Sequence, residues 1–466
     1  MRKLTFLLSS FLIFGFIGAE AAESNKPNIV VIFADDLGYG DLGCYGANYP
    51  TPALDQMAAE GFRSTDLISA ANVCTPSRAA LLTGRYPSRA GLPTYRIRGK
   101  EGHYGLHPDE ITIAELLKTA GYRSLAVGKW HIGFLMEGAH PMDQGFDAYY
   151  GLPYNYSTRH GSWNKAIFRD REMSEENVKF PGITDRYNEE VVKFIEKQSK
   201  DEPFFIYMAH QIAHTPVVPS KAFKGKSKEG KYADFVTELD HSVGLVFQAL
   251  RDNGLDENTL VVFLADNGHH GKVGSGGPLA GSKYNTMEGG HRVAGIFRWP
   301  GTISAGQVSD VTLSSMDLLP LFCDLADVEL PTDRIIDGKN IRDVLLGQSD
   351  KSPHEFLYYY NGMNLQAVRN GKWKLHLPRT ARDQPYWGGV SVKRNFATLD
   401  QPFLVNLDND IGETVNVAAD NPEVVATLLK EAERIRAELG DVGQTGSDQR
   451  ALWRPYNSKL NEPAKK

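Results

Sequence analysis

Short, unbroken apolar runs that alternate with amphipathic segments constrain the fold of this chain more than any other feature. Helical periodicity covers residues 112–121 and 232–254. Around these segments lie four apolar runs rich in β-branched residues, typical of strands buried on both faces, at residues 28–33, 124–127, 204–208 and 259–265. Strands that alternate with helices predict an α/β fold, in which helices sandwich a large mixed, mostly parallel sheet.

The pattern changes near Ser352. Residues 356–378 hold two strand-like runs around the Arg-Asn-Gly sequence at 369–371, and an Asn-Gly pair favours a type I′ hairpin turn. A further strand-like run and a helical pattern follow at residues 403–407 and 422–439. We therefore predict a smaller C-terminal antiparallel sheet with one helix, followed by a loosely held polar tail.

The first residues have the pattern of a signal peptide. Arg2 and Lys3 precede an apolar run, and the small-residue motif at 19–21 stands ahead of the expected cleavage. An uncleaved membrane anchor is the alternative, but the run is shorter than a bilayer span of roughly 20 residues. We predict export to the periplasm or the extracellular space. The predicted segments are a signal peptide (1–21), a catalytic domain (25–350), a C-terminal α+β subdomain (351–440) and a polar tail (441–466).

The composition excludes one class of partner. The chain is 41% hydrophobic and 23% charged, with a formal net charge of −6 and no block of like charges, so nucleic acid is not an expected partner. Export implies an oxidising compartment, yet the chain has only 3 cysteines, an odd number without a disulfide framework. Cys44 and Cys323 could pair after export, which would leave Cys74 unpaired.

Two pairs of oxygen-bearing residues follow apolar strands directly. Asp35 and Asp36 follow the run at 28–33, and Asp266 and Asn267 follow the run at 259–265. In a parallel sheet, ligands bind beyond the carboxyl ends of the strands, so the two pairs could share one cation. Carboxylate and amide oxygens suit Ca²⁺ or Mg²⁺ better than Zn²⁺. The alternative is ordinary turn chemistry, because Asp and Asn often begin loops.

Cys74 opens the stretch CTPSRAALLTG, residues 74–84. We predict a helix with Thr75 as N-cap, Pro76 as first residue and Gly84 at its end. A helix N-terminus binds anions and lowers the pKa of a thiol, and Arg78 adds a positive charge nearby. The alternative is a buried structural cysteine.

Lysine and histidine side chains complete a candidate site for transfer of an oxyanion group. The residues are Lys129, His131, His214 and Lys283, each just beyond a strand-like run or in a Gly-rich loop. Cations neutralise the oxygens of such a group, and histidines move protons to the leaving group. Taken singly, such residues more often lie at the surface or in the core, and we assign that role to His210, His241 and His291.

Two motifs make the set resemble the type I sulfatases of the alkaline phosphatase superfamily. Residues 74–84 fit the family signature C-x-P-S-R-x-x-x-L-T-G, and GYRSLAVGKWHIG at 121–133 fits the second signature. The resemblance runs over most of the mature chain. It implies an alkaline phosphatase-like fold, hydrolysis of sulfate esters, and a maturation enzyme that oxidises Cys74 to Cα-formylglycine, whose hydrate is a geminal diol.

The resemblance also implies a role for each candidate residue. Asp35, Asp36, Asp266 and Asn267 would hold Ca²⁺ together with an oxygen of modified residue 74. One oxygen of the diol would attack sulfur, and Arg78 would stabilise the diol. The sulfate oxygens would be held by Lys129 and Lys283, His214 would protonate the departing alcohol, and His131 would take the proton of the second hydroxyl.

Some positions depart from the family pattern. Ala213 stands where many relatives have proline, Ala280 and Ser282 alter the loop around Lys283, and Ala294 replaces a common proline. Because these changes blur the alignment of loops, His210 is the alternative to His214.

Export favours a sulfated carbohydrate as substrate. Loop residues that could line its pocket are Arg96, Arg98, His103, Arg159, His160, His269 and His270. Two other functions stay open: a phosphonate monoester or phosphodiester hydrolase of the same superfamily, and a protein that binds sulfated glycans without turnover.

Overall fold

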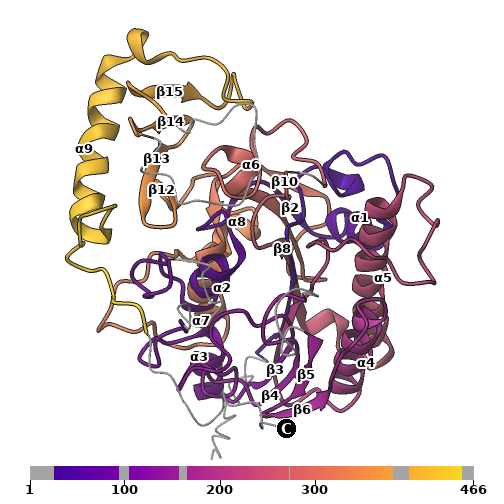
Figure 1. Cartoon of the computed structure of the whole chain (residues 1–466). Coiled ribbons are helices and arrows are strands. Elements are labelled where there is room, and N and C mark those ends of the chain that lie inside the picture. The colour runs from indigo at the N-terminus through magenta and orange to yellow at the C-terminus, as the bar shows by residue number, and fades with distance from the viewer. Residues whose placement is uncertain (1–25, 94–103, 157–164, 272, 381–397, 454–466) are drawn as a thin grey trace, which may run out of the picture.

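The computed structural model describes residues 26–93, 104–156, 165–271, 273–380 and 398–453. A large sheet lies between two layers of helices, and a smaller sheet with one long helix lies beside it (Figure 1). The predicted signal peptide is outside the described residues, as are five candidate pocket residues: Arg96, Arg98, His103, Arg159 and His160.

The centre of the large sheet consists of the four strands that the sequence predicts. β1 (Asn28–Ala34) pairs in parallel with β7 (Phe204–Ala209) on one side and with β8 (Thr259–Ala265) on the other. β3 (Arg123–Gly128) continues in parallel beyond β7. Every residue of β1, β7 and β8 is buried, as expected for runs without apolar–polar alternation.

Outer strands make the sheet mixed. Next to β8 lies the antiparallel strand β9 (Arg292–Arg298), and next to β9 lies β2 (Phe62–Ile68). β2 also pairs in parallel with the short strands β10 (Gln307–Ser309) and β11 (Leu313–Ser314). At the other edge lie β4 (Ala148–Gly151), β5 (Ile167–Arg169) and β6 (Glu172–Glu175).

Helices cover both faces of this sheet (Figure 1). One layer contains α1 (Pro52–Ala59), α4 (Ile183–Ile195) and α5 (Lys231–Asp252). The other contains α2 (Cys74–Thr83), α3 (Ile113–Thr119), α7 (Leu318–Leu325) and α8 (Arg342–Leu345). All residues of α2 are buried, and it ends at Gly84, whose left-handed φ of 67° is the predicted helix stop.

The C-terminal sheet is antiparallel, as predicted. Its strands are, in spatial order, β12 (Leu357–Asn361), β13 (Asn364–Asn370), β14 (Trp373–His376) and β15 (Phe403–Asn406). α9 (Pro422–Leu439) covers it and buries one helical face. That face is Leu428, Ala432, Ile435 and Leu439, packed against apolar side chains of the strands.

Two local predictions were wrong in this region. Asn370 pairs with Trp373, so the hairpin loop is Gly371 and Lys372, one residue later than predicted. Only Gly371 has a left-handed φ, of 52°, whereas a type I′ turn needs two such residues. The start of the tail is also held in place, because the N–H of Arg450 donates to the Ser88 carbonyl at 3.0 Å.

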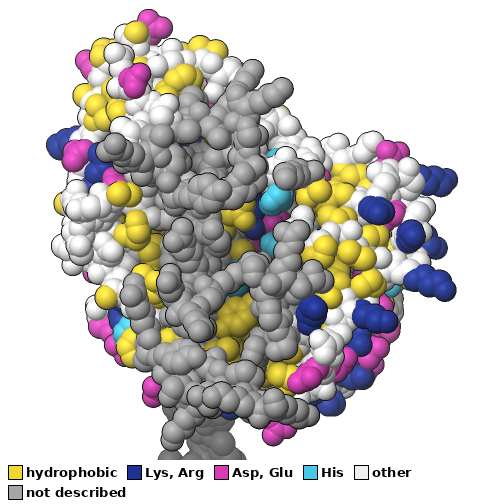
Figure 2. All heavy atoms as spheres, in the orientation of Figure 1, with side chains coloured by type: hydrophobic (Ala, Val, Ile, Leu, Met, Phe, Trp, Pro, Cys, Tyr) yellow, Lys and Arg dark blue, Asp and Glu magenta, His cyan; other side chains and the backbone are white. Residues whose placement is uncertain are grey.

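The face shown in Figure 1 is hollowed near its centre. In the space-filling view, histidine, basic and acidic side chains gather there, close to the position at which Figure 1 labels β8 (Figure 2). Charged side chains inside a hollow are expected at a site that handles a polar ligand.

Candidate active site

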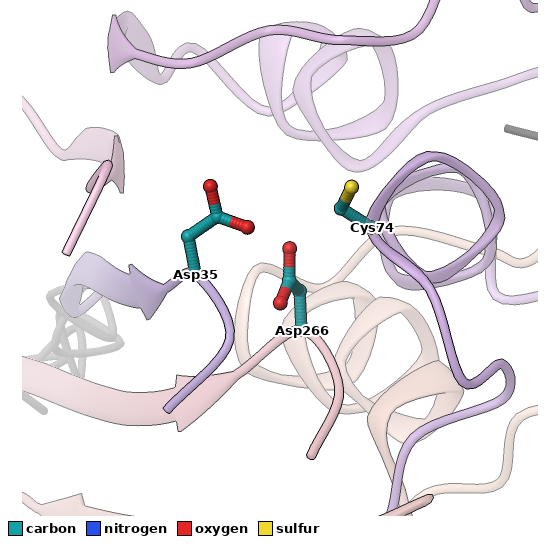
Figure 3. A group of neighbouring side chains, drawn as sticks. All are labelled: Asp35, Cys74 and Asp266. Atoms are coloured by element: carbon teal, nitrogen blue, oxygen red, sulfur yellow. The ribbon is translucent and has the colours of Figure 1, made fainter. Parts of the chain in front are cut away.

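The ends of β1 and β8 bring the two predicted oxygen-bearing pairs together. The strands run in register from Asn28 to Ala34, so Asp35 and Asp266 follow neighbouring strand ends (Figure 3). The N–H of Asp36 donates to Asp266 Oδ1 at 3.1 Å. Asp36 has a left-handed φ of 59°, which interrupts the strand alternation, so two consecutive carboxylates can face one site.

Cys74 reaches the same place from the opposite side. Its Sγ and one carboxylate oxygen each of Asp35 and Asp266 lie within 4.8 Å of one another, and Figure 3 shows the three side chains pointing toward a common space. The predicted Thr75 N-cap was wrong: α2 already begins at Cys74, and the Thr75 hydroxyl donates to the His131 carbonyl at 3.0 Å. Pro76 still fits, because N–H groups of the first turn need no partner within the helix.

The chain has three free cysteines. Cys44, Cys74 and Cys323 all lie among the described residues, and none forms a disulfide. Cys323 is buried in α7 and Cys44 is half-buried near Asp55, where burial raises the pKa of each thiol to about 12. The suggested pairing of these two cysteines is therefore absent from the structure.

Several buried oxygen atoms at this site lack hydrogen-bond partners. Among the described residues, Asp35 Oδ1, Asp36 Oδ2 and Asn267 Oδ1 are buried and accept no hydrogen bond. The amide of Asn267 is oriented by its Nδ2, which donates to Asp36 Oδ1 at 2.8 Å. A buried polar atom without a partner destabilises the fold, and hard oxygens are the ligands of Ca²⁺ and Mg²⁺. The residues therefore fit a divalent cation.

Three cationic side chains surround these oxygens. Lys129 Nζ lies 2.7 Å from Asp35 Oδ2, and Arg78 Nη2 lies 2.9 Å from Asp266 Oδ2. Lys283 Nζ lies 2.5 Å from Asp36 Oδ1 and 4.0 Å from Cys74 Sγ. We call the following set the strand-end cluster: Asp35, Asp36, Asp266, Asn267, Arg78, Lys129 and Lys283.

Glycine at the end of β3 fixes the position of Lys129. Gly128 has a φ of 101°, and a Cβ there would lie 1.9 Å from the Ala209 carbonyl oxygen. Because no side chain intervenes, the N–H of Lys129 can donate to that same oxygen at 2.8 Å. The end of β3 thus places Lys129 beside the end of β7.

Burial and the charges of the strand-end cluster shift the pKa values of its residues. Burial alone would raise the pKa of Asp35, but the cations around it, Lys129 above all, hold that pKa well below its usual range. Burial, and next the charge of Asp35, raise the pKa of Asp266. Burial would lower the pKa of Lys283, but the Asp36 carboxylate outweighs it and raises that pKa. A divalent cation bound beside Asp266 would lower the pKa of that carboxyl group again.

His214 is the histidine that reaches the cluster from the loop after β7. Its Nε2 lies 3.7 Å from Asp36 Oδ2, and its Nδ1 lies 2.6 Å from the Thr215 carbonyl oxygen. Because a carbonyl only accepts, Nδ1 carries the ring hydrogen. Burial lowers the pKa of His214 to about 4. His210 instead turns to α5, where its Nε2 lies 3.2 Å from Ser242 Oγ.

His131 lies beside the first turn of α2. It is buried, has a φ of 62°, and its carbonyl accepts the hydrogen bond of Thr75 described above.

Two histidines that the sequence analysis assigned to ordinary roles have partners outside the strand-end cluster. His291 Nδ1 lies 2.9 Å from the Ser69 carbonyl oxygen, and His241 is exposed beside Phe223.

Two residues near the cluster had no signal in the sequence. The Ser69 hydroxyl donates to the Asp266 carbonyl at 2.6 Å, but a single serine carries no pattern. Tyr284 follows Lys283, has a φ of 75°, and its ring centre lies 5.2 Å from Lys283 Nζ. Of the candidate pocket residues, His269 and His270 are half-buried, and the His269 carbonyl accepts from the N–H of Lys283 at 2.8 Å.

Comparison with known proteins decides what kind of protein holds this cluster. The sulfatase family profile matches residues 27–328, and the profile for the C-terminal region of aryl-sulfatase matches residues 352–464. The chain belongs to the sulfatase family. This sulfatase is thus a sulfuric ester hydrolase, and the predicted resemblance is confirmed.

Individual relatives agree over most of their length. Human arylsulfatase A is 36% identical, over 91% of this chain and 90% of that protein. Mouse N-acetylgalactosamine-6-sulfatase is 39% identical, over 81% of this chain and 76% of that protein. The crystal structure of Ps i-CgsB in complex with k-i-k-neocarrahexaose has a TM-score of 0.79 and 29% identity, and covers 93% of this chain and 96% of that one. The alkaline phosphatase-like fold is therefore confirmed for this sulfatase. In its described segments, no helix combines the length and apolarity needed to cross a membrane.

Proposed function

We propose that this sulfatase hydrolyses sulfate esters of carbohydrates, with a Cα-formylglycine hydrate made from Cys74 as nucleophile and with Ca²⁺ as Lewis acid. The observation that carries the proposal is the position of Cys74 Sγ, within 4.8 Å of one carboxylate oxygen each of Asp35 and Asp266. Beside it lie oxygens that accept no hydrogen bond from the described residues. Asp35, Asp36, Asp266, Asn267 and modified residue 74 would hold the ion. When bound, Ca²⁺ supplies positive charge that stabilises the sulfate oxygens during transfer.

The side chain at residue 74 needs two hydroxyl groups for turnover. As an aldehyde hydrate, it attacks sulfur with one hydroxyl oxygen, and the other hydroxyl later restores the aldehyde when the bond to sulfate breaks. Arg78, buried and bonded to Asp266 and to the Lys129 carbonyl, holds a fixed positive charge beside the diol. Lys129 and Lys283 neutralise the oxygens of the sulfate group.

Two histidines move the protons. His214 protonates the oxygen of the departing alcohol through Nε2, the ring nitrogen that faces the cluster. Burial lowers the pKa of His214 to about 4, and the negative charge of a sulfate ester beside it would raise that pKa again. His131, next to the first turn of α2, takes the proton of the second hydroxyl as sulfate leaves.

A sulfated carbohydrate is the proposed substrate class. One similar protein is named N-acetylgalactosamine-6-sulfatase, and one similar structure contains k-i-k-neocarrahexaose. The half-buried ring of Tyr284 lies beside Lys283, next to the position proposed for the sulfate group. The signal-peptide pattern of residues 1–21 supports export to the periplasm or extracellular space, and a formylglycine-generating enzyme is the expected maturation partner.

Mass analysis and parallel assays test the proposal together. The tryptic peptide that contains residue 74 should have the mass of an aldehyde or its hydrate in place of the thiol. The purified protein should release sulfate from sulfated sugars and aryl sulfates faster than it cleaves phosphodiesters or phosphonate monoesters. An unmodified thiol in an active preparation would contradict the assignment of a formylglycine hydrate as nucleophile. Faster phosphodiester cleavage, or binding of sulfated sugars without turnover, would contradict the assignment of sulfate ester hydrolysis.

A further inference from the structure

A short helix links two segments of the strand-end cluster. α6 (Glu288–His291) follows the loop that bears Lys283. The N–H of Gly268, next to Asn267, donates to the Gly290 carbonyl at 3.1 Å. The N–H of Gly289 donates to the Ala280 carbonyl, in the Lys283 loop, at 2.7 Å. The position of α6 therefore sets the spacing between Asn267 and the Lys283 loop.

The contacts between α6 and the neighbouring loops leave no space for a side chain at two glycines. A Cβ on Gly268 would lie 1.7 Å from the Gly289 carbonyl oxygen, and a Cβ on Gly290 would lie 2.1 Å from the Asn285 carbonyl oxygen. Backbone atoms meet directly at both places. A displacement of α6 would consequently move Asn267, the Lys283 loop or both.

Residues of the C-terminal part of the chain hold Glu288, the first residue of α6. Lys374 Nζ and the Tyr359 hydroxyl each donate to Glu288 Oε1 at 2.9 Å. The N–H of Glu288 donates to Glu413 Oε2 at 2.7 Å, and Lys374 Nζ lies 2.9 Å from Glu413 Oε1. These side chains are buried, with at most 2% of any residue exposed. Nearby, the Thr286 hydroxyl donates to Gln366 Oε1 of β13 at 3.0 Å.

The charges around Glu288 form a balanced set, which we call the interface cluster. It consists of Asp66, Glu288, Glu413, Arg292, Arg369 and Lys374, with an ion pair for each carboxylate. Burial would raise the pKa of Glu288, but the three cations, Lys374 above all, hold it well below its usual range. Buried ion pairs seldom stabilise a fold more than apolar side chains of the same volume. Stability alone therefore gives a weak reason for such a cluster, whereas fixed geometry gives a strong one.

We propose that Lys374, Tyr359 and Glu413 are positioning residues, which act through Glu288 and α6 to set Lys283 and Asn267 for the reaction. The proposal rests on the proposed function, which gives Lys283 the sulfate oxygens and Asn267 the cation. In this arrangement the C-terminal sheet does more than cover the large domain. It fixes one side of the active site from a sheet that contributes no residue to the strand-end cluster.

Double-mutant cycles with Lys283 test the proposal. Lys374→Met should lower kcat/KM for an aryl sulfate by about 10- to 100-fold, because displacement of about 1 Å at a reacting group has effects of this size. In a Lys283→Ala background, the same substitution should lower kcat/KM less than about threefold, since the positioned group is already gone. If Lys374→Met fails to fold, Tyr359→Phe replaces it in the same comparison, because this substitution removes one hydrogen bond from Glu288.

A matched control uses another ion pair between the C-terminal part of the chain and the large domain. Glu438 of α9 pairs with Arg89 of the large domain, far along the chain from Lys283. Glu438→Gln should weaken docking and lower the unfolding midpoint, yet leave kcat/KM per folded molecule unchanged. Equal losses in both backgrounds, or an unchanged kcat/KM in a folded Lys374→Met or Tyr359→Phe variant, would overturn the positioning role.

A calcium readout separates this proposal from the proposed function. Ca²⁺ should raise the unfolding midpoint of the wild-type protein, and the rise should be smaller in Lys374→Met because Asn267 is displaced. A wild-type protein with the aldehyde but without sulfate release would contradict the proposed function alone. An undiminished calcium effect in Lys374→Met, in a wild-type background that does release sulfate, would contradict the positioning of Asn267.

Discussion

The strand-end cluster and the interface cluster are both buried sets of three carboxylates and three cations. Their hydrogen bonds differ. In the interface cluster, every carboxylate oxygen of Asp66, Glu288 and Glu413 accepts a hydrogen bond. In the strand-end cluster, Asp35 Oδ1 and Asp36 Oδ2 accept none from the described residues.

This difference shows which property marks a ligand site. Balanced charge is common to both clusters and does not distinguish them. Among the described residues, carboxylate oxygens without partners occur where a cation and a sulfate group are expected. The carboxylates whose proposed task is to hold a shape have partners at every oxygen. Hydrogen-bond partners at the carboxylate oxygens, rather than balanced charge, therefore separate the proposed reactive cluster from the proposed positioning one.

The largest expected effect follows from loss of the modified residue. Cys74→Ser should lower kcat by about 10⁵-fold or more, the scale seen when a nucleophile is removed. A serine hydroxyl can attack sulfur, but it has no second hydroxyl with which to expel sulfate. Steady-state sulfate release measures the loss, and Cys323→Ser, which removes another buried thiol, should keep normal turnover. Full turnover in Cys74→Ser would contradict the mechanism.

Matched aspartates test the contrast between the clusters directly. Asp266→Asn should abolish the rise in unfolding midpoint caused by Ca²⁺ and lower kcat/KM by about 10³-fold, because a ligand of the ion is lost. Asp66→Asn removes the same charge from the interface cluster, and should destabilise the fold while it keeps most of the calcium effect. Scanning fluorimetry with Ca²⁺ or a chelator measures both. Equal loss of the calcium effect in the two variants would erase the distinction.

Two lysines, one from each cluster, test the contrast between the clusters through the free energy of unfolding. Lys374→Met leaves two buried carboxylates short of a partner, and should lower the free energy of unfolding by about 3–5 kcal/mol without Ca²⁺ and by no less with Ca²⁺. Lys129→Met frees Asp35 in a site that fits a cation, so added Ca²⁺ should reduce its destabilisation to below about 2 kcal/mol. Denaturant unfolding at two Ca²⁺ concentrations gives both values. A Ca²⁺-dependent rescue of Lys374→Met would show that the two clusters are not different in kind.

The strand-end cluster could be predicted because its residues follow strands directly. Parallel neighbours must end at one edge, so the positions of Asp35 and Asp266 follow from the order of apolar runs. The link between Glu288 and Lys374 could not be predicted. A single glutamate and a single lysine, 86 residues apart, form no pattern until two separate sheets dock against each other.

Local details failed for a related reason. The sequence around Thr75 permits an N-cap, but the His131 carbonyl, 56 residues away, accepts its hydroxyl instead. The Asn-Gly pair at 370–371 permits a type I′ turn, but the pairing of β13 with β14 extends through Asn370. At Thr75 a long-range partner satisfied a group for which local chemistry offered another solution, and at Asn370 the strand pairing extended one residue beyond the position that the local turn signal indicated.

The smallest of these effects distinguishes two histidines that follow the same strand. His214 Nε2 faces Asp36 at 3.7 Å, whereas His210 Nε2 lies 3.2 Å from Ser242 Oγ of α5. His214→Ala should lower kcat by about 10²-fold for sugar sulfates, whose alcohols need a proton to leave, and less for aryl sulfates of acidic phenols. His210→Ala should destabilise the fold without this dependence on the leaving group. The slope of log kcat against the pKa of the leaving alcohol or phenol measures this dependence. An equal slope in wild type and His214→Ala would remove His214 from the proton transfer, and a steeper slope in His210→Ala would assign that step to His210.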